Sequence, residues 1–201
     1  MQLPPEHEMI EIVDESNRVT GVRERAEIHR QGLWHRSVHI FIFNSRGEIY
    51  LQKRSPQKDQ YPEHWDSSAA GHLNPGESPE VAAHRELGEE LGIDTELTEA
   101  YRHPACQETG WEFATLYVGR TDETIRLNLD EATEGRFFTT AQLRDLLEDP
   151  DQKVAPGFRL LHQVTAFHLR KAAFKGRGVQ PSLEGTSWDR IRDMSYEGRG
   201  G

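Results

Sequence analysis

A short hydrophobic segment, residues 37–44 (SVHIFIFN), limits the folds open to this chain more than any other feature. Bulky side chains occupy both alternating sets of positions, so a β-strand here carries large groups on both faces and is expected at the centre of a sheet. Further strand-like segments are residues 9–25, typical of a hairpin around a polar turn at 14–17, and residues 48–54, 111–120 and 134–138. These strands alternate irregularly with few helices. That order predicts an α/β (α+β) fold with a mixed β-sheet and helices on its faces.

A chain of 201 residues is long enough to bury one hydrophobic core without disulfide or metal support. We expect one domain over residues 1–150. Residues 156–174 carry apolar side chains at helical spacing, so 151–174 is predicted to be a C-terminal helix that packs on the domain or joins a homodimer. Residues 175–201 are rich in Gly, Ser, Arg and Asp, which predicts a flexible tail.

The overall charge limits the partners of the chain. With 34 acidic and 24 basic residues the net charge is −10, which disfavours broad attraction to nucleic acid or to an anionic membrane. An anionic substrate then needs local positive charge or metal ions. The single cysteine, Cys106, excludes an intramolecular disulfide, suits a reducing compartment and is expected to be a small structural residue. No apolar run approaches membrane-spanning length, so we expect a cytoplasmic protein.

Residues 70–93 (AGHLNPGESPEVAAHRELGEELGI) contain a glycine-hinged loop followed by a helix with an unusual charge pattern. Ser78 is a favourable N-cap, Pro79 suits the first helical position and Gly92 suits the stop, so the sequence predicts a helix over residues 79–91. At about 100° per residue, three carboxylates fall within one narrow stripe of this helix: Glu86, Glu89 and Glu90.

The acidic stripe is unfavourable for a helix that merely faces solvent, which is the alternative interpretation. Glu86 and Glu90 form a like-charge pair at i and i+4 that costs about 0.2–0.5 kcal/mol, and carboxylates in the last turn oppose the helix dipole by about 0.3–1 kcal/mol. Arg85 can neutralise only part of this charge. Hard oxygen ligands without sulfur favour Mg²⁺ or Mn²⁺. Because Mg²⁺ commonly shares its ligand shell with substrate phosphates, the stripe predicts a phosphate-bearing small-molecule substrate, with backbone carbonyls of the 71–77 loop near the metal.

The spacing of these residues resembles the Nudix box, Gly-x5-Glu-x7-Arg-Glu-U-x-Glu-Glu-x-Gly-U, in which U is aliphatic. Gly71, Glu77 and the run RELGEELGI at residues 85–93 match it at every fixed position. Seven fixed residues at about 7% frequency each give a chance match on the order of 10⁻⁸ per starting point. The resemblance implies a Nudix fold, an α/β/α sandwich, and hydrolysis of a diphosphate linkage in a small (nucleoside) diphosphate compound.

The same resemblance implies roles for individual residues. Arg85 would orient Glu89, Glu77 would fix the loop, and Gly71 and Gly92 would be structural. The implied metal ligands are Glu86, Glu89, Glu90 and the backbone carbonyl of Ala70. A metal-activated water would attack a phosphorus of the diphosphate. The base that takes its proton varies within the family; the favoured candidates here are Glu90 and Glu112, ahead of Glu131 and Glu134.

The sequence around the box, residues 32–55 and 61–72, resembles the Nudix branch related to isopentenyl-diphosphate isomerase. In that isomerase a metal is held by histidines and glutamates, and the positions that look equivalent are His35, His72 and Glu112. The isomerase also needs a cysteine two residues before the matching histidine, where this chain has Ala70. Because interconversion of two alkenes needs an acid and a base on opposite faces, the missing thiol favours the hydrolase over the isomerase. A nucleotide sensor without turnover is a third alternative, disfavoured by the intact box.

Further residues are candidates for contacts with the substrate. Lys53 and Arg54 are candidates to hold substrate phosphates, against the alternative of a solvated strand end. Three aromatic residues are expected in the core rather than stacked on a base: Trp34, Tyr61 and Trp65.

Overall fold

The computed structural model describes the backbone of residues 8–175 and the side chains of residues 8–166. Nearly all of the predicted tail therefore lies outside the described residues. The described elements follow the order β1 (Met9–Val13), β2 (Val19–Glu24), α1 (Arg25–Gln31), β3 (His35–Phe43), β4 (Ile49–Arg54), β5 (Trp65–Asp66), β6 (Ala69–His72), α2 (Pro79–Leu91), β7 (Leu97–His103), β8 (Glu112–Arg120), β9 (Ala132–Phe138), α3 (Thr140–Glu148) and α4 (Pro156–Lys175).

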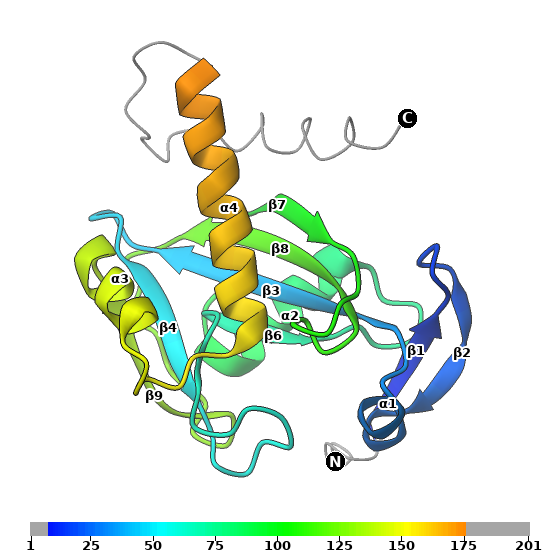
Figure 1. Cartoon of the computed structure of the whole chain (residues 1–201). Helices are drawn as coiled ribbons and strands as arrows, with labels where there is room; N and C mark the ends of the chain where they lie inside the picture. Colours follow the sequence, from blue (N-terminus) through cyan, green and yellow to red (C-terminus); the bar gives the residue numbers. More distant parts are fainter. Residues whose placement is uncertain (1–7, 176–201) are drawn as a thin grey trace.

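Strand β3 lies at the centre of one mixed sheet, as its hydrophobic pattern predicts (Figure 1). It pairs in parallel with β8 along its whole length, and antiparallel with β1, β6 and β4. The sheet continues outward through β7 beyond β8, through β2 beyond β1, and through β5 and β9 beside β4. The predicted α/β fold with a mixed sheet is confirmed.

The edge of β3 that faces away from β8 is shared by β1, β6 and β4, and the last two of these diverge. Strand β6 pairs with Ser37–Ile40 of β3, whereas β4 pairs only with Ile42 and Phe43 farther along. The sheet therefore splits at the middle of β3. At the split Ser68 bridges the gap: its amide donates to the Ile40 carbonyl at 3.0 Å and its hydroxyl accepts from the Ile42 amide at 2.8 Å.

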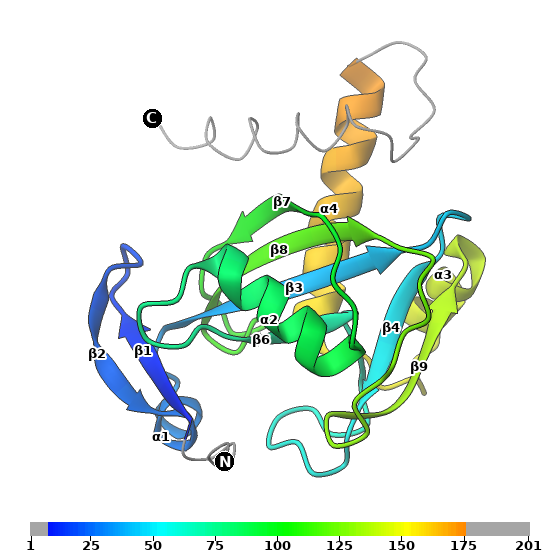
Figure 2. The same ribbon diagram turned by 180° about the vertical axis from the view of Figure 1, so that it is seen from behind.

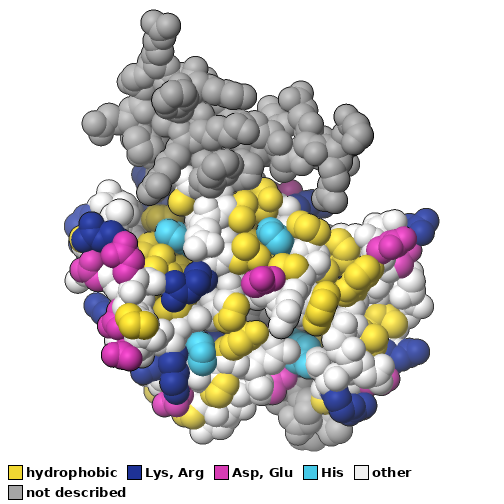
Figure 3. All heavy atoms as spheres, in the orientation of Figure 1, with side chains coloured by type: hydrophobic (Ala, Val, Ile, Leu, Met, Phe, Trp, Pro, Cys, Tyr) yellow, Lys and Arg dark blue, Asp and Glu magenta, His cyan; other side chains and the backbone are white. Residues whose placement is uncertain are grey.

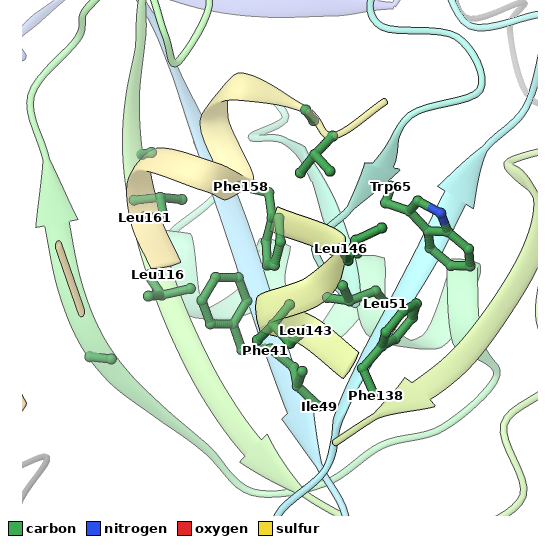
Figure 4. Packing of buried hydrophobic residues seen from close by; sticks show 14 residues of the cluster. Phe41, Ile49, Leu51, Trp65, Leu116, Phe138, Leu143, Leu146, Phe158 and Leu161 are labelled. Carbon is green, nitrogen blue, oxygen red and sulfur yellow. The ribbon is translucent and has the colours of Figure 1, made fainter. Parts of the chain in front are cut away.

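Helices cover both faces of the sheet. Helix α4 crosses in front of β3 and β8 in Figure 1, and α2 crosses in front of the same strands in the reverse view of Figure 2. On the α4 side, Phe41 of β3 meets Phe158 of α4 edge to face, with ring centroids 5.4 Å apart (Figure 4). On the α2 side, Val38, Ile40 and Ile42 pack against apolar residues of α2. Alternate residues of β3 thus pack into two separate hydrophobic cores, one on each face of the sheet.

Local sequence signals set the ends of α2. The Ser78 hydroxyl accepts a hydrogen bond from the Val81 amide at 3.3 Å, and Pro79 is the first helical residue. Gly92 adopts a left-handed φ of 62° and its amide donates to the Gly88 carbonyl. The helix therefore begins and ends where the sequence predicts.

Several elements were not predicted from the sequence. Helix α1 has a single buried side chain, Ile28, so it carries no clear helical periodicity. Strands β5 and β6 are only two and four residues long, and β7 alternates between half-buried and exposed positions. The predicted hairpin is confirmed as β1 and β2. Its turn is held by the Asp14 carboxylate, which accepts from two later amides.

The surface of the protein carries both acidic and basic side chains. On the face shown in Figure 3, acidic and basic side chains are interspersed rather than gathered in separate patches. Within residues 8–175, none of the helices combines the length and the apolar composition that a membrane span requires.

Candidate functional site

A cavity of about 920 Å³ lies beside the split in the sheet. Its lining brings together segments that are far apart in the sequence: residues 8–9, α1, β3, the 55–64 loop, β6, α2, the 108–112 region, the 128–131 loop and residues 155–157. Two groups of potential cation ligands face it. One comes from α2, and the other comes from α1, β3, β6 and β8; the β3 member of this second group, His35, is fully buried and is not part of the cavity wall.

Arg85 organises the first group. Its guanidinium donates to both carboxylate oxygens of Glu77 at 2.9 Å, and its Nη1 lies 2.7 Å from Glu86 Oε1 and 3.2 Å from Glu89 Oε2. Glu77 in turn accepts from the Asn74 amide at 2.8 Å, which closes the loop before α2. The structure therefore brings together the residues that the box assigns to this network.

The acidic stripe carries more negative charge than its partners neutralise. Glu86 and Glu90 are 8% and 5% exposed, whereas the Glu89 side chain is 44% exposed. Burial raises the pKa of Glu86, an effect that the adjacent Arg85 opposes. Burial and then repulsion from Glu86 raise the pKa of Glu90 well above its usual value, an effect that Lys58 opposes. Among the described residues, the donors to Glu90 Oε2 are neutral groups, the Gln52 amide and the Ala70 N–H. A divalent cation would complete this charge balance.

Gly71 fits this arrangement sterically. A Cβ at this position would lie 2.0 Å from Glu86 Oε1 and 2.2 Å from Glu86 Cδ, so a side chain here would displace the carboxylate. The Ala70 amide reaches Glu90 at 3.3 Å. The role of the Ala70 carbonyl as a metal ligand stays a prediction. Together, the absent side chain, the buried acids and their all-oxygen donors fit Mg²⁺ or Mn²⁺.

The second group is a cluster of three histidines and one carboxylate: His29, His35, His72 and Glu112. One ligand atom from each lies within 4.8 Å of all the others. Glu112 Oε1 is 3.3 Å from His72 Nε2 and 3.5 Å from His35 Nε2, and His29 Nε2 is 3.4 Å from His72 Nε2. Three of these residues were sequence candidates. His29 was missed because it lies on the unpredicted helix α1.

The outward ring nitrogens of the cluster have partners of their own. His29 Nδ1 is 2.8 Å from Asp59 Oδ2, and His35 Nδ1 is 2.8 Å from the Leu33 carbonyl. His72 Nδ1 lies 4.0 Å from a carboxylate oxygen of Glu8. Every Nε2 therefore points inward, and that of His35 is buried without a hydrogen-bond partner. Three nitrogens and one oxygen fit a first-row transition cation better than Mg²⁺.

Opposite charges hold the cluster together electrostatically. Burial by itself would raise the pKa of Glu112, but the facing imidazoles of His35, His39 and His72 hold that pKa well below its usual range. Burial would lower the pKa of His72, yet Glu112 and Glu8 raise it overall. Glu112 is therefore an ionised ligand candidate.

The two predicted phosphate contacts separate in the structure. Arg54 lines the cavity, where it also donates to Asp66 Oδ2 at 3.1 Å. Lys53, its neighbour on β4, is not part of the cavity wall, because successive strand residues point to opposite faces. Lys58 in the following loop lines the cavity and pairs with Glu131. Its position five residues after Lys53, in a loop, gave no sequence signal.

The three aromatic residues predicted to lie in the core, and Cys106, differ in burial and in their distance from the cavity. Trp65 is buried and packs edge to face on Phe138, and the Trp34 ring lies 6.2 Å from that of Phe113. Tyr61 lines the cavity instead of the core. The half-buried Cys106 lies outside the cavity wall.

The chain is similar to known proteins in both sequence and fold. The sequence model of the NUDIX domain family matches residues 33–158. The chain belongs to the Nudix family. The matched Nudix domain runs from just before β3 to the first turn of α4, so it contains the acidic stripe and three members of the histidine cluster. His29, α1 and the β1–β2 hairpin precede the matched residues, and Phe158 and Leu161 of α4 complete the Nudix core.

Relatives place this Nudix chain near the isomerase-like branch. It is 34% identical over 150 residues to Isopentenyl-diphosphate Delta-isomerase 2 of Photorhabdus laumondii, covering 72% of this chain and 85% of the relative. It is 38% identical over 131 residues to the Uncharacterized Nudix hydrolase PA4841 of Pseudomonas aeruginosa, covering 65% and 78%. The crystal structure of DR0079 from Deinococcus radiodurans matches with a TM-score of 0.70 and 26% identity, covering 79% of this chain and 99% of that one.

Proposed function

We propose that this protein is a divalent-metal-dependent Nudix hydrolase that cleaves a diphosphate linkage in a small, (nucleoside) diphosphate compound. The observation that carries the proposal is the pair of buried carboxylates Glu86 and Glu90, whose charge Arg85 alone does not balance. A binding site for the cation together with an anionic substrate resolves this imbalance.

The carboxylates would hold Mg²⁺ or Mn²⁺ through Glu86, Glu89 and Glu90. A cation bound there supplies Lewis acidity toward a phosphate oxygen and lowers the pKa of water. Arg85 fixes Glu86 and Glu89 in position through its paired hydrogen bonds. Arg54 and Lys58 border the same cavity, where they are paired with Asp66 and Glu131. They would offer positive charge to substrate phosphates that displace these carboxylates.

The two candidate bases differ in the direction of their pKa shifts. An efficient general base has a pKa near the working pH. In the metal-free protein the pKa of Glu112 is held well below its usual range and that of Glu90 is raised. A cation bound by Glu90 would lower the pKa of Glu90, so both residues stay candidates for the base. Glu112 is better suited to ligate the second cation, together with the Nε2 atoms of His29, His35 and His72.

The second candidate function is isomerisation of isopentenyl diphosphate. It is favoured by the histidine cluster and by relatives whose names state that activity. Ala70 argues against it, because this β6 position of the cavity wall carries no thiol for proton transfer. Cys106 does not line the cavity and cannot substitute for it.

A substrate screen separates the two functions. Wild type and Glu89→Gln are incubated with nucleoside di- and triphosphates, sugar nucleotides and isopentenyl diphosphate, with Mg²⁺ or Mn²⁺, and products are separated by chromatography. We expect hydrolysis of at least one compound and a loss of about 10-fold or more in the variant, whose exposed position should leave the fold intact. Equal hydrolysis by both proteins would place the activity elsewhere. Formation of the alkene isomer would establish the isomerase instead.

A further inference from the structure

His39 is a buried polar residue of the cavity that neither cation site uses as a ligand. It lies on β3, four residues after His35 and therefore on the same face of the strand, and it is 7% exposed. Its Nδ1 is 2.9 Å from the hydroxyl of Ser67, and its Nε2 is 3.8 Å from Glu112 Oε2. Ser67 is fully buried between β5 and β6.

The surroundings determine which ring nitrogen carries the proton. An unprotonated Nε2 would direct its lone pair at the ionised carboxylate of Glu112, which is electrostatically unfavourable. Nε2 therefore carries hydrogen and points it at Glu112. Nδ1 then accepts a hydrogen bond from the Ser67 hydroxyl, which makes no other hydrogen bond within the described part of the chain. A hydrogen bond thus joins the Ser67 hydroxyl to His39, and the His39 Nε2–H faces Glu112 Oε2 across 3.8 Å, an electrostatic contact longer than a hydrogen bond.

This arrangement divides the two oxygens of Glu112 between different neighbours. Oε1 faces His35 and His72 inside the cluster, whereas Oε2 faces His39. We propose that His39, with its tautomer set by Ser67, is a positioning residue that holds Glu112 with Oε1 directed at a cation in the histidine cluster. The proposal rests on the histidine cation site proposed above. Outer partners of this kind typically change metal affinity or activity 10–100-fold when removed.

A histidine kept only for packing would behave differently. Its replacement by a residue of similar volume would change the stability of the fold but not the affinity of the cluster for metal. A matched control is available in His84 on α2, whose side chain is 38% exposed, contacts Asp94 and lies outside the cavity wall.

Titration of the full chain with Co²⁺ tests the proposal without reference to turnover, since its visible absorption reports nitrogen ligation. The variants are His39→Leu, which removes both ring nitrogens, His39→Gln, which keeps an N–H donor near the Nε2 position, Ser67→Ala and the control His84→Leu. We expect His39→Leu to weaken Co²⁺ binding about 10–100-fold, His39→Gln to recover most of it and Ser67→Ala to fall between. His84→Leu should bind like wild type, and thermal melting confirms that each variant folds.

The outcomes distinguish this proposal from the site on which it rests. The histidine cation site itself is overturned if wild type shows no Co²⁺ absorption band, or if that band persists in His35→Ala and His72→Ala. If that band is present and His39→Leu binds Co²⁺ as tightly as wild type, the positioning role of His39 is overturned. Equal weakening by His39→Gln and His39→Leu, in step with lost thermal stability, would also overturn it in favour of packing. If His39→Leu does not fold, the milder Ser67→Ala decides between the same results.

Discussion

Replacing Glu90 with glutamine is expected to stabilise the metal-free protein. The carboxylate is almost fully buried and its hydrogen-bond partners are neutral. Removing an uncompensated buried charge should add about 1–3 kcal/mol to the free energy of unfolding. The buried Oε1 of Gln52, which has no partner, could also accept from the new amide. Since each kcal/mol shifts Tm by about 2–4 °C in a chain of this size, Glu90→Gln should melt about 2–12 °C above wild type in EDTA at neutral pH.

Mg²⁺ should narrow or reverse this difference. A ligand at 100 times its Kd stabilises the folded state by about 2.7 kcal/mol, and the variant, lacking one carboxylate ligand, should gain much less. Scanning calorimetry in EDTA and across a Mg²⁺ series measures both effects. Glu134→Gln is the matched control, because that side chain is 51% exposed on β9 and is not part of the cavity wall. It should follow wild type throughout.

The difference in stability between Glu90→Gln and wild type should depend on pH in one direction. The folded-state pKa of Glu90 lies above the ordinary value of 4.5, so the folded state binds more protons than the unfolded state between these two pKa values. Wild-type stability at this residue therefore falls as pH rises through the raised pKa. The advantage of Glu90→Gln should be largest at neutral pH and disappear below about pH 4.5. A variant that melts below wild type in EDTA and responds equally to Mg²⁺ would refute the reasoning.

Three further substitutions test other parts of the site. Gly71→Ala places a Cβ 2.0 Å from Glu86 Oε1, so the carboxylate must move away from its position in the site. We expect kcat for the substrate found in the screen to fall about 100-fold. Unchanged steady-state kinetics would contradict this. Asp59→Ala removes the partner of His29 Nδ1 and should weaken Co²⁺ binding about 10–100-fold by calorimetry, whereas an equal Kd would show that the contact is dispensable. Gly92→Ala puts a side chain at φ 62° and should cost about 1–2 kcal/mol in urea denaturation, an effect that an unchanged midpoint would disprove.

Local interactions account for what could be predicted from the sequence. The hydrogen bond from Val81 to Ser78 and the left-handed Gly92 involve residues within four positions of each other, so the limits of α2 follow from its own sequence. One helix also fixes the relative directions of its side chains. The acidic stripe and its pairing with Arg85 could therefore be predicted from spacing alone.

Burial and long-range pairing account for what could not. Only the packing of α2 on the sheet decides that Glu86 and Glu90 are buried while Glu89 is exposed. The direction of the β4 strand decides that Arg54, and not Lys53, lines the cavity. Neither fact is encoded within a few residues.

The sequence by itself determined a central strand, a capped helix and an acidic stripe, because each depends on neighbours in the chain. Only the tertiary structure decided that His29 completes the histidine cluster and that Ser67, His39 and Glu112 lie in a row beside it. The residues of both groups come from separate elements, α1, the β5–β6 connection, β3, β6 and β8, and meet through the pairing of β3 with β6 and β8. Contacts between residues so far apart depend on strand register and helix packing, which no short segment specifies.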